Sequence, residues 1–143
     1  MLNPHAPILP YIGVAGLKLY DNIDNFKTIL MQKNVKTFSF DKSLVRYEID
    51  NLLFLFFNLV NGKLYKITAL GDYKGSLFNK IFIGTNVVDL LKIEPSFEYD
   101  EFEEVYHSKR GVFIETDAET NDVMWISVFV KELETDKFDD AKW

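Results

Sequence analysis

The sequence predicts an α+β fold made of two similar units, in which antiparallel strands follow a strand and a helix and pack against one or two short helices. Three observations predict this fold. Residues 17–29 (LKLYDNIDNFKTI) resemble residues 81–93 (IFIGTNVVDLLKI). Apolar residues in both segments recur at the three- and four-residue spacing of one helix face. Strand-like segments separated by turn dipeptides then follow each copy, which is typical of antiparallel meanders.

Each unit is expected to contain one helix. The first unit spans 11–72, and its helix should run from Asn22 to about Lys33, with Asp21 at the start. The second unit spans 80–133, and its helix should run from Asn86 to about Ile93, with Thr85 in the equivalent place. Asp and Thr suit a helix start because their side-chain oxygens accept hydrogen bonds from free backbone N–H groups. The apolar faces of both helices should be buried: Ile23, Phe26, Ile29, Val87, Leu90 and Ile93.

Four strands are expected after the first helix, at 35–40, 45–49, 52–59 and 63–70. The dipeptides Asp50-Asn51 and Asn61-Gly62 tolerate positive φ, so they should close two hairpins. After the second helix a strand is expected at 96–100, and the segments 108–111 and 118–122 should form the equivalent turns. The run LLFLFFNL at 52–59 is apolar on both faces, so we expect a central strand that other elements cover. The alternative is that part of this strand faces a protein partner. Residues 73–79 should connect the units of this single domain, 1–143, and 134–143 should form a frayed tail.

Composition narrows the class of function. The 143 residues carry a formal charge of −6 and include no cysteine. Negative charge disfavours nucleic acid and anionic membranes as partners and favours a basic protein. A chain without cysteine lacks disulfides, thiolate metal sites and a cysteine nucleophile, which fits a reducing compartment. Prolines interrupt the first 16 residues, unlike a secretory signal, and no apolar run is long enough to cross a bilayer. We therefore expect a cytoplasmic protein.

Residues typical of catalysis are scarce. His5 and His107 have no metal-ligand spacing, and His107 is expected to be an outward-facing strand residue. There is no glycine-rich phosphate loop and no nucleophile motif. Glu103 and Glu104 are adjacent, and adjacent strand residues point to opposite faces of a sheet. We therefore expect no catalytic residue, no metal and no cofactor, and a protein that is not an enzyme.

Two acidic segments are the candidate binding surface. In residues 94–106 (EPSFEYDEFEEVY), carboxylates alternate with aromatic residues, and 115–122 (ETDAETND) is a second acidic turn. A run of charge can be simply a solvated loop. In a docking surface, aromatic residues would supply contact area and carboxylates would attract a basic partner. The residues assigned to this surface are Tyr99, Asp100, Glu101, Phe102, Glu103, Glu104, Glu115, Asp117 and Glu119.

Two resemblances add to this interpretation. The phrase IFIGTNVVDLLK, followed by an antiparallel meander with an aromatic strand, resembles the tandem modules of β-lactamase-inhibitor-like proteins, which are duplicated, acidic and protein-binding. In size, acidity, aromatic β content and lack of catalytic residues, the chain is similar to immunity proteins of bacterial contact-dependent growth inhibition and related polymorphic toxin systems. That resemblance implies neutralisation of one cognate toxin domain, commonly a basic nuclease.

Two other functions remain open at this point. The first is an accessory or adaptor protein that uses the same acidic, aromatic surface for assembly. The second is a small enzyme or a ligand-binding domain with a cavity between the units. A buried polar pocket holding His107 and several carboxylates would favour the second of these alternatives.

Overall fold

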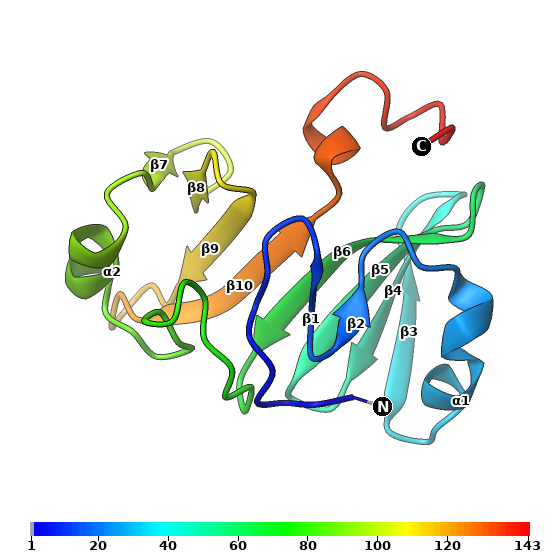
Figure 1. The fold of residues 1–143 in the computed structure, drawn as a ribbon, viewed down its shortest axis with the longest axis horizontal. Coiled ribbons are helices and arrows are strands. Elements are labelled where there is room, and N and C mark those ends of the chain that lie inside the picture. Colours follow the sequence, from blue (N-terminus) through cyan, green and yellow to red (C-terminus); the bar gives the residue numbers. More distant parts are fainter. Residues whose placement is uncertain (1) are drawn as a thin grey trace.

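A computed structural model describes residues 2–143 and contains one large sheet, one small sheet and only short helices (Figure 1). The strands β1 (Gly13–Val14) and β2 (Leu17–Lys18) form a two-stranded antiparallel pair near the start of the chain. A 3₁₀ turn, η1 (Ile23–Phe26), then continues into the single-turn helix α1 (Lys27–Leu30).

The large sheet has eight antiparallel strands in the order β3-β4-β5-β6-β10-β9-β8-β7. Its first four strands follow α1 directly: β3 (Val35–Ser39), β4 (Leu44–Ile49), β5 (Leu53–Asn58) and β6 (Lys63–Leu70). After the helix α2 come the other four: α2 (Val87–Ile93), β7 (Glu98–Asp100), β8 (Val105–Ser108), β9 (Val112–Thr116) and β10 (Val123–Phe129). A second 3₁₀ turn, η2 (Lys131–Glu134), follows β10.

The predicted α+β class with duplicated helix-plus-sheet units is wrong. The protein is mostly β, with 39% of residues in strands and 13% in helices. Pairing of β10 with β6 joins the strands into one continuous sheet instead of separate sheets under separate helices. The helices α1 and α2 have 4 and 7 residues, which is too short for either to cover a sheet. The apolar spacing that predicted longer helices belongs in part to η1 and to loop residues.

The strand and turn predictions are confirmed more closely. Hairpin turns lie at the expected dipeptides, where Asp50 has φ 48° and Gly62 has φ 74°. Both helical segments begin at an asparagine, one residue after the predicted Asp21 and Thr85. The Asn22 side chain accepts a hydrogen bond from Asp24 N at 2.9 Å, and the Asn86 side chain accepts one from Val88 N at 3.0 Å. Of the six residues expected to be buried, Phe26 and Leu90 are buried and the other four are partly exposed.

The first face of the sheet is covered by the N-terminal segment and by the loop after β6. Ile8, Val14 and Leu77 from these segments are buried in the core. Tyr73 joins the two segments: its hydroxyl accepts a hydrogen bond from Ala15 N at 2.9 Å and donates one to Ala6 O at 2.6 Å. This packing replaces the helical cover that the sequence pattern predicted.

Strand β5 is the centre of the first half of the sheet, and all six of its residues are buried, as predicted for this apolar run. Phe57 packs on Phe26 of η1, with ring centroids 5.2 Å apart, on the covered face. On the second face of the sheet, Phe54 packs edge-on against Trp125 of β10 at 5.3 Å. Covering both faces of this strand keeps its apolar side chains away from water.

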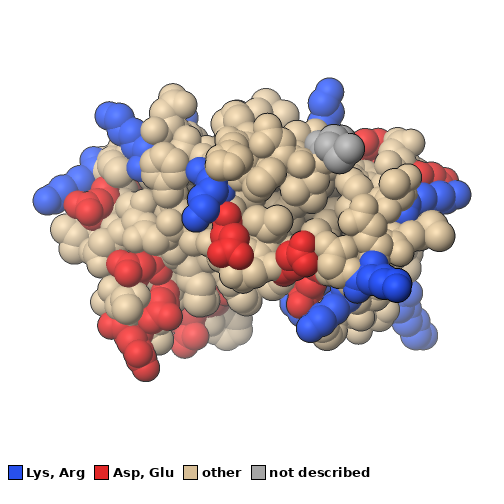
Figure 2. Space-filling view, turned by 90° about the horizontal axis from the view of Figure 1, so that it is seen from below, with Lys and Arg blue, Asp and Glu red and all other residues tan. Residues whose placement is uncertain are grey.

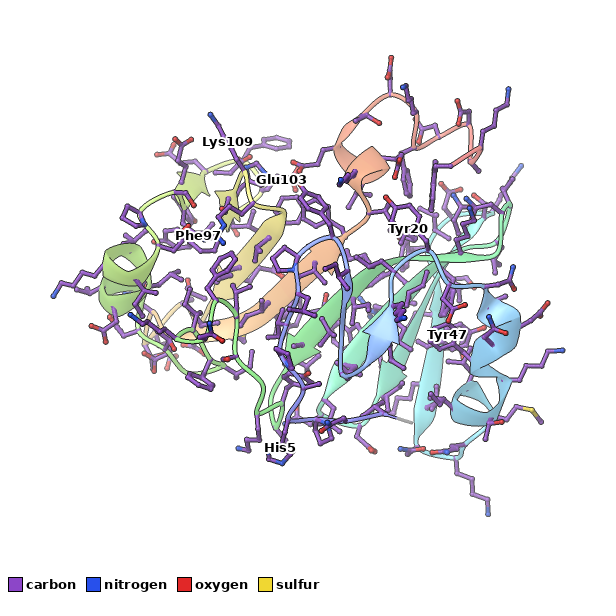
Figure 3. All side chains as sticks on the ribbon, viewed as in Figure 1. His5, Tyr20, Tyr47, Phe97, Glu103 and Lys109 are labelled. Carbon is purple, nitrogen blue, oxygen red and sulfur yellow. The ribbon has the colours of Figure 1, made fainter. Side chains whose placement is uncertain are left out.

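Residues 131–143 pack against β6 and the N-terminal segment, whereas the sequence suggested a frayed tail at 134–143. Phe138 is buried, lying 5.0 Å from Tyr65 and stacked on Trp143. The Tyr20 hydroxyl donates to Glu132 Oε1 at 2.6 Å, and Figure 3 shows Tyr20 beneath this segment. Aromatic contacts that are distant in sequence therefore hold the segment in place. No helix within residues 2–143 is long and apolar enough to cross a membrane.

Candidate functional site

The acidic hairpin, residues 98–108, lies at one of the two edges of the large sheet, opposite the edge formed by β3. Its strands β7 and β8 pair with Tyr99 opposite Tyr106 and Asp100 opposite Val105. Asp100 Oδ1 shapes the turn between them by accepting hydrogen bonds from Phe102 N at 2.9 Å and Glu103 N at 3.0 Å. Since β7 is the last strand of the sheet, one of its edges is unpaired. A hairpin in this position is open to a partner along its edge and at its tip.

Aromatic side chains project from this hairpin. Phe102, in the turn, is 91% exposed, and Tyr99 is 50% exposed. The Tyr99 and Tyr106 rings lie 4.9 Å apart, which supports Tyr99 from behind. An almost fully exposed Phe contributes nothing to the core, although burying such a ring against a partner would be favourable.

The negative charge of the protein is concentrated around this hairpin. Residues 94–122 contain ten acidic and two basic side chains, a net charge of −8, whereas the rest of the chain carries a net charge of +2. Figure 2 shows acidic side chains gathered at the end of the molecule where α2 and β7–β9 lie. The net negative charge of the protein therefore comes from one end of the molecule.

The structure brings most, but not all, of the predicted site residues together. Tyr99, Asp100, Glu101, Phe102, Glu103 and Glu104 all lie on the acidic hairpin and are all exposed. Glu115 lies apart from them, half-buried in β9 on the second face of the sheet. Glu103 and Glu104 lie in a turn, so the strand alternation used to separate them does not apply.

Asp117 and Glu119 belong to the β9–β10 turn. The register of β8 with β9 places this turn at the same end of the strands as the tip of the acidic hairpin. Hydrogen bonds from Thr120 N at 3.1 Å and Glu119 N at 2.9 Å hold the pKa of the Asp117 carboxyl below its usual value. Asn86 Nδ2 donates to Asp122 Oδ1 at 3.1 Å and so ties the turn to the start of α2. Asp117 thus shapes a turn in addition to carrying charge.

A hollow of about 600 Å³ lies on the second face of the sheet, between the acidic hairpin and η2. We call it the sheet pocket. Its charged and titratable lining comes from six residues: Lys66, Asp100, Glu103, His107, Glu115 and Glu134. Val105, Phe113 and Leu133 supply apolar wall. Ser127 forms part of the floor, where its small side chain, hydrogen-bonded to Thr68 at 2.7 Å, leaves room above the sheet.

His107 is half-buried and lines this pocket, in contrast to the outward-facing residue that the sequence suggested. Its Nε2 atom lies 3.0 Å from Glu134 Oε2, although the two groups are not aligned for a good hydrogen bond. Figure 3 shows Glu103 on the hairpin, toward η2. Within residues 2–143, no group of three His, Asp or Glu side chains is placed to hold a metal ion.

Two side chains of the sheet pocket have shifted pKa values. Burial lowers the pKa of the Lys66 ammonium, and the nearby carboxylate of Glu115 only partly opposes this effect. Burial also raises the pKa of the Glu115 carboxyl, against the influence of Lys66. Both shifts have the sign expected when desolvation outweighs attraction between opposite charges. The only signal in the sequence for Lys66 was a lysine in the middle of the mixed strand KLYKITAL.

The comparisons with known proteins bear on the fold alone. No protein-family model matches the chain, and a search of curated proteins finds no match. The structure is similar to the crystal structure of a cysteine-rich secretory protein from Staphylococcus aureus subsp. aureus Mu50, with a TM-score of 0.55 and 13% sequence identity. The likeness covers 91% of this chain and 50% of that chain, so this chain spans about half of its neighbour's length. At this identity the likeness shows a shared fold.

Proposed function

We propose that this protein is a non-enzymatic immunity protein that binds and neutralises a basic toxin domain, such as a nuclease, in the cytoplasm. The observation that carries the proposal is Phe102, which is 91% exposed at the tip of a hairpin that also carries Glu98, Asp100, Glu101, Glu103 and Glu104. A phenylalanine ring that is exposed among carboxylates contributes little to the stability of the core. It suits recognition of a basic surface.

The two kinds of side chain have different roles in this proposal. Complementary charge mainly accelerates association and selects the partner, and its effect falls as salt rises. An aromatic ring buried at the centre of an interface mainly slows dissociation. The carboxylates of the acidic hairpin would therefore capture the toxin, and Phe102 and Tyr99 would hold it.

The test begins with affinity purification of the tagged protein from its native host. The expected result is stoichiometric recovery of one basic domain, which inhibits growth when expressed alone and is harmless when the parent protein is co-expressed. Phe102→Ala should weaken the capture without changing thermal stability. A captured partner that is harmless when expressed alone would contradict neutralisation and favour the adaptor function.

A matched pair of charge variants tests the surface itself. The first variant reverses Glu98, Glu101 and Glu104 to Lys; it spares Asp100, which shapes the turn, and Glu103, which lines the sheet pocket. The second reverses Asp72, Asp136 and Asp139, which are exposed carboxylates outside the hairpin, and it changes the net charge equally. Only the first variant should lose the partner. Equal loss in both variants would show a dependence on net charge alone and would contradict a specific acidic hairpin.

A further inference from the structure

The Lys66 ammonium makes no ion pair in direct contact, although the carboxylates of Glu115 and Glu103 act on it from a greater distance. No carboxylate lies within 4.0 Å of its Nζ atom among residues 2–143. Its Nζ atom lies 4.8 Å from the centroid of the Phe56 ring. Protein atoms surround most of the side chain, and desolvation lowers its pKa. A desolvated ammonium in a hollow has unused capacity for an anionic group.

The rest of the sheet pocket has the opposite charge. Asp100 and Glu103 come from the hairpin, Glu115 from β9 and Glu134 from η2. The pocket therefore has four carboxylates and one lysine, and it would repel a ligand that is only anionic. A ligand that is only cationic would leave Lys66 unpaired and be repelled by it.

The register of the sheet places the backbones of Lys66 and Glu115 at different positions along the strands. Lys66 lies opposite Phe129 of β10, whereas Glu115 lies opposite Trp125, four residues away along the same strand. At about 3.3 Å per residue, the backbones of these two positions are separated by roughly 13 Å along the strand. Lys66, Glu115 and Ser127 all line the hollow, and none of the ion pairs among residues 2–143 joins Lys66 to Glu115. Val105 and Phe113 form an apolar part of the wall of the same hollow.

We propose that the sheet pocket binds a small zwitterion whose carboxylate pairs with Lys66, whose apolar body lies on Phe113 and Val105, and whose ammonium faces Glu115 and Glu103. An ω-amino carboxylate has this chemistry, because its two charges are separated by methylene groups. The volume of about 600 Å³ is within the range of small-molecule sites. This site is distinct from the exposed rings of the hairpin, and its occupation does not require the toxin partner.

The experiment is a titration of the isolated protein, followed by calorimetry or by NMR shifts of pocket residues. The probes are 6-aminohexanoate and two analogues that each lack one charge, hexylamine and hexanoate. We expect 6-aminohexanoate to bind at least about 10-fold more tightly than either analogue. Each analogue lacks one charge-assisted contact, and the loss of one such contact weakens binding by about 10-fold. Equal binding of hexylamine would show a simple cation site and would overturn the proposal, as would no binding of 6-aminohexanoate at millimolar concentration.

Two variants locate the site. Lys66→Met keeps the apolar stem and should reduce the affinity for 6-aminohexanoate to that for hexylamine. Lys74→Met removes an exposed lysine outside the pocket and should change nothing. Unchanged binding in a folded Lys66→Met protein would contradict the proposal. If this variant does not fold, the three-ligand comparison on the parent protein still decides.

Discussion

Aromatic residues behave differently at the two ends of the large sheet. At the β3–β6 end, on the second face, cations lie over the rings: the Arg46 guanidinium is 4.9 Å from the centroids of both Phe38 and Phe54, and the Lys66 ammonium is 4.8 Å from the centroid of Phe56. Phe54 and Phe56 are buried there. At the β7–β8 end, Phe102 is 91% exposed and its neighbours are carboxylates.

The two ends differ in the charge of the side chains that neighbour their aromatic rings. The face of an aromatic ring carries negative potential, so a guanidinium or ammonium stays over it and its aliphatic stem shields the ring from water. Carboxylates have no such attraction to the ring face. Arg46 and Lys66 therefore cover the rings of Phe54 and Phe56, although Phe38 on the edge strand β3 is still 42% exposed beneath Arg46. The aromatic residues of the hairpin have only glutamate and aspartate beside them and stay accessible.

The largest expected effect separates a core Phe from a surface Phe. Phe54→Ala should lower the free energy of unfolding by about 3–5 kcal/mol, because it leaves a cavity beside Trp125. Phe102→Ala should change it by no more than about 0.5 kcal/mol. Chemical denaturation of both variants measures the two values. Similar losses in both would mean that Phe102 packs on the protein, and the comparison of the two ends would fail.

A smaller effect is expected at the β8–β9 turn, where the acidic end meets the N-terminal segment. A Cβ atom on Gly111, which has φ 89°, would lie 2.5 Å from the Tyr11 ring. Gly111→Ala should therefore cost about 1–3 kcal/mol of stability through backbone strain and this clash. Gly84→Ala is the matched control, since Gly84 has φ 99° but a Cβ atom added there would meet no atom within 4 Å. In thermal unfolding, Gly111→Ala should have a lower melting temperature than Gly84→Ala. Equal melting temperatures would show that the contact with Tyr11 does not limit stability.

The smallest effect concerns pH. The raised pKa of Glu115 means that the native state binds more protons than the unfolded chain between the ordinary value of 4.5 and the raised value. Stability should therefore fall as pH rises through this window. Glu115→Gln should raise the free energy of unfolding at pH 7 by less than about 0.5 kcal/mol, because the group is partly solvated. This gain should disappear below pH 4.5, and a gain that persisted there would show that ionisation is not its cause.

The sequence predicted local features better than the assembly of the fold. Turns at Asp50-Asn51 and Asn61-Gly62 depend on neighbouring residues only, and they were predicted correctly. The pairing of β6 with β10 depends on residues about 60 positions apart, such as Ile67 and Val128, and no local pattern specifies it. That pairing produces one sheet, so the fold class was missed.

The candidate site likewise has a part that the local sequence predicted and a part that depends on the folded chain. The acidic hairpin is contiguous in sequence, so its residues could be chosen from composition and alternation. The sheet pocket combines Lys66 of β6, His107 of β8 and Glu134 of η2, which only the folded chain brings together. From the sequence, His107 was expected to face outward, and a polar pocket around it was named only as the finding that would favour an enzyme or a ligand-binding domain. The sheet pocket, with His107 and four carboxylates in its lining, is a finding of that kind.

The most direct test of the central claim is the association rate of the captured basic partner with the parent protein and with the variant in which Glu98, Glu101 and Glu104 are reversed to Lys. Stopped-flow measurements at several salt concentrations provide it, with circular dichroism to verify folding. We predict association at least about 10-fold slower in the variant at low salt, with a difference that shrinks as salt rises. Equal association rates of the two proteins at every salt concentration would contradict the claim and leave the acidic hairpin as a solvated edge.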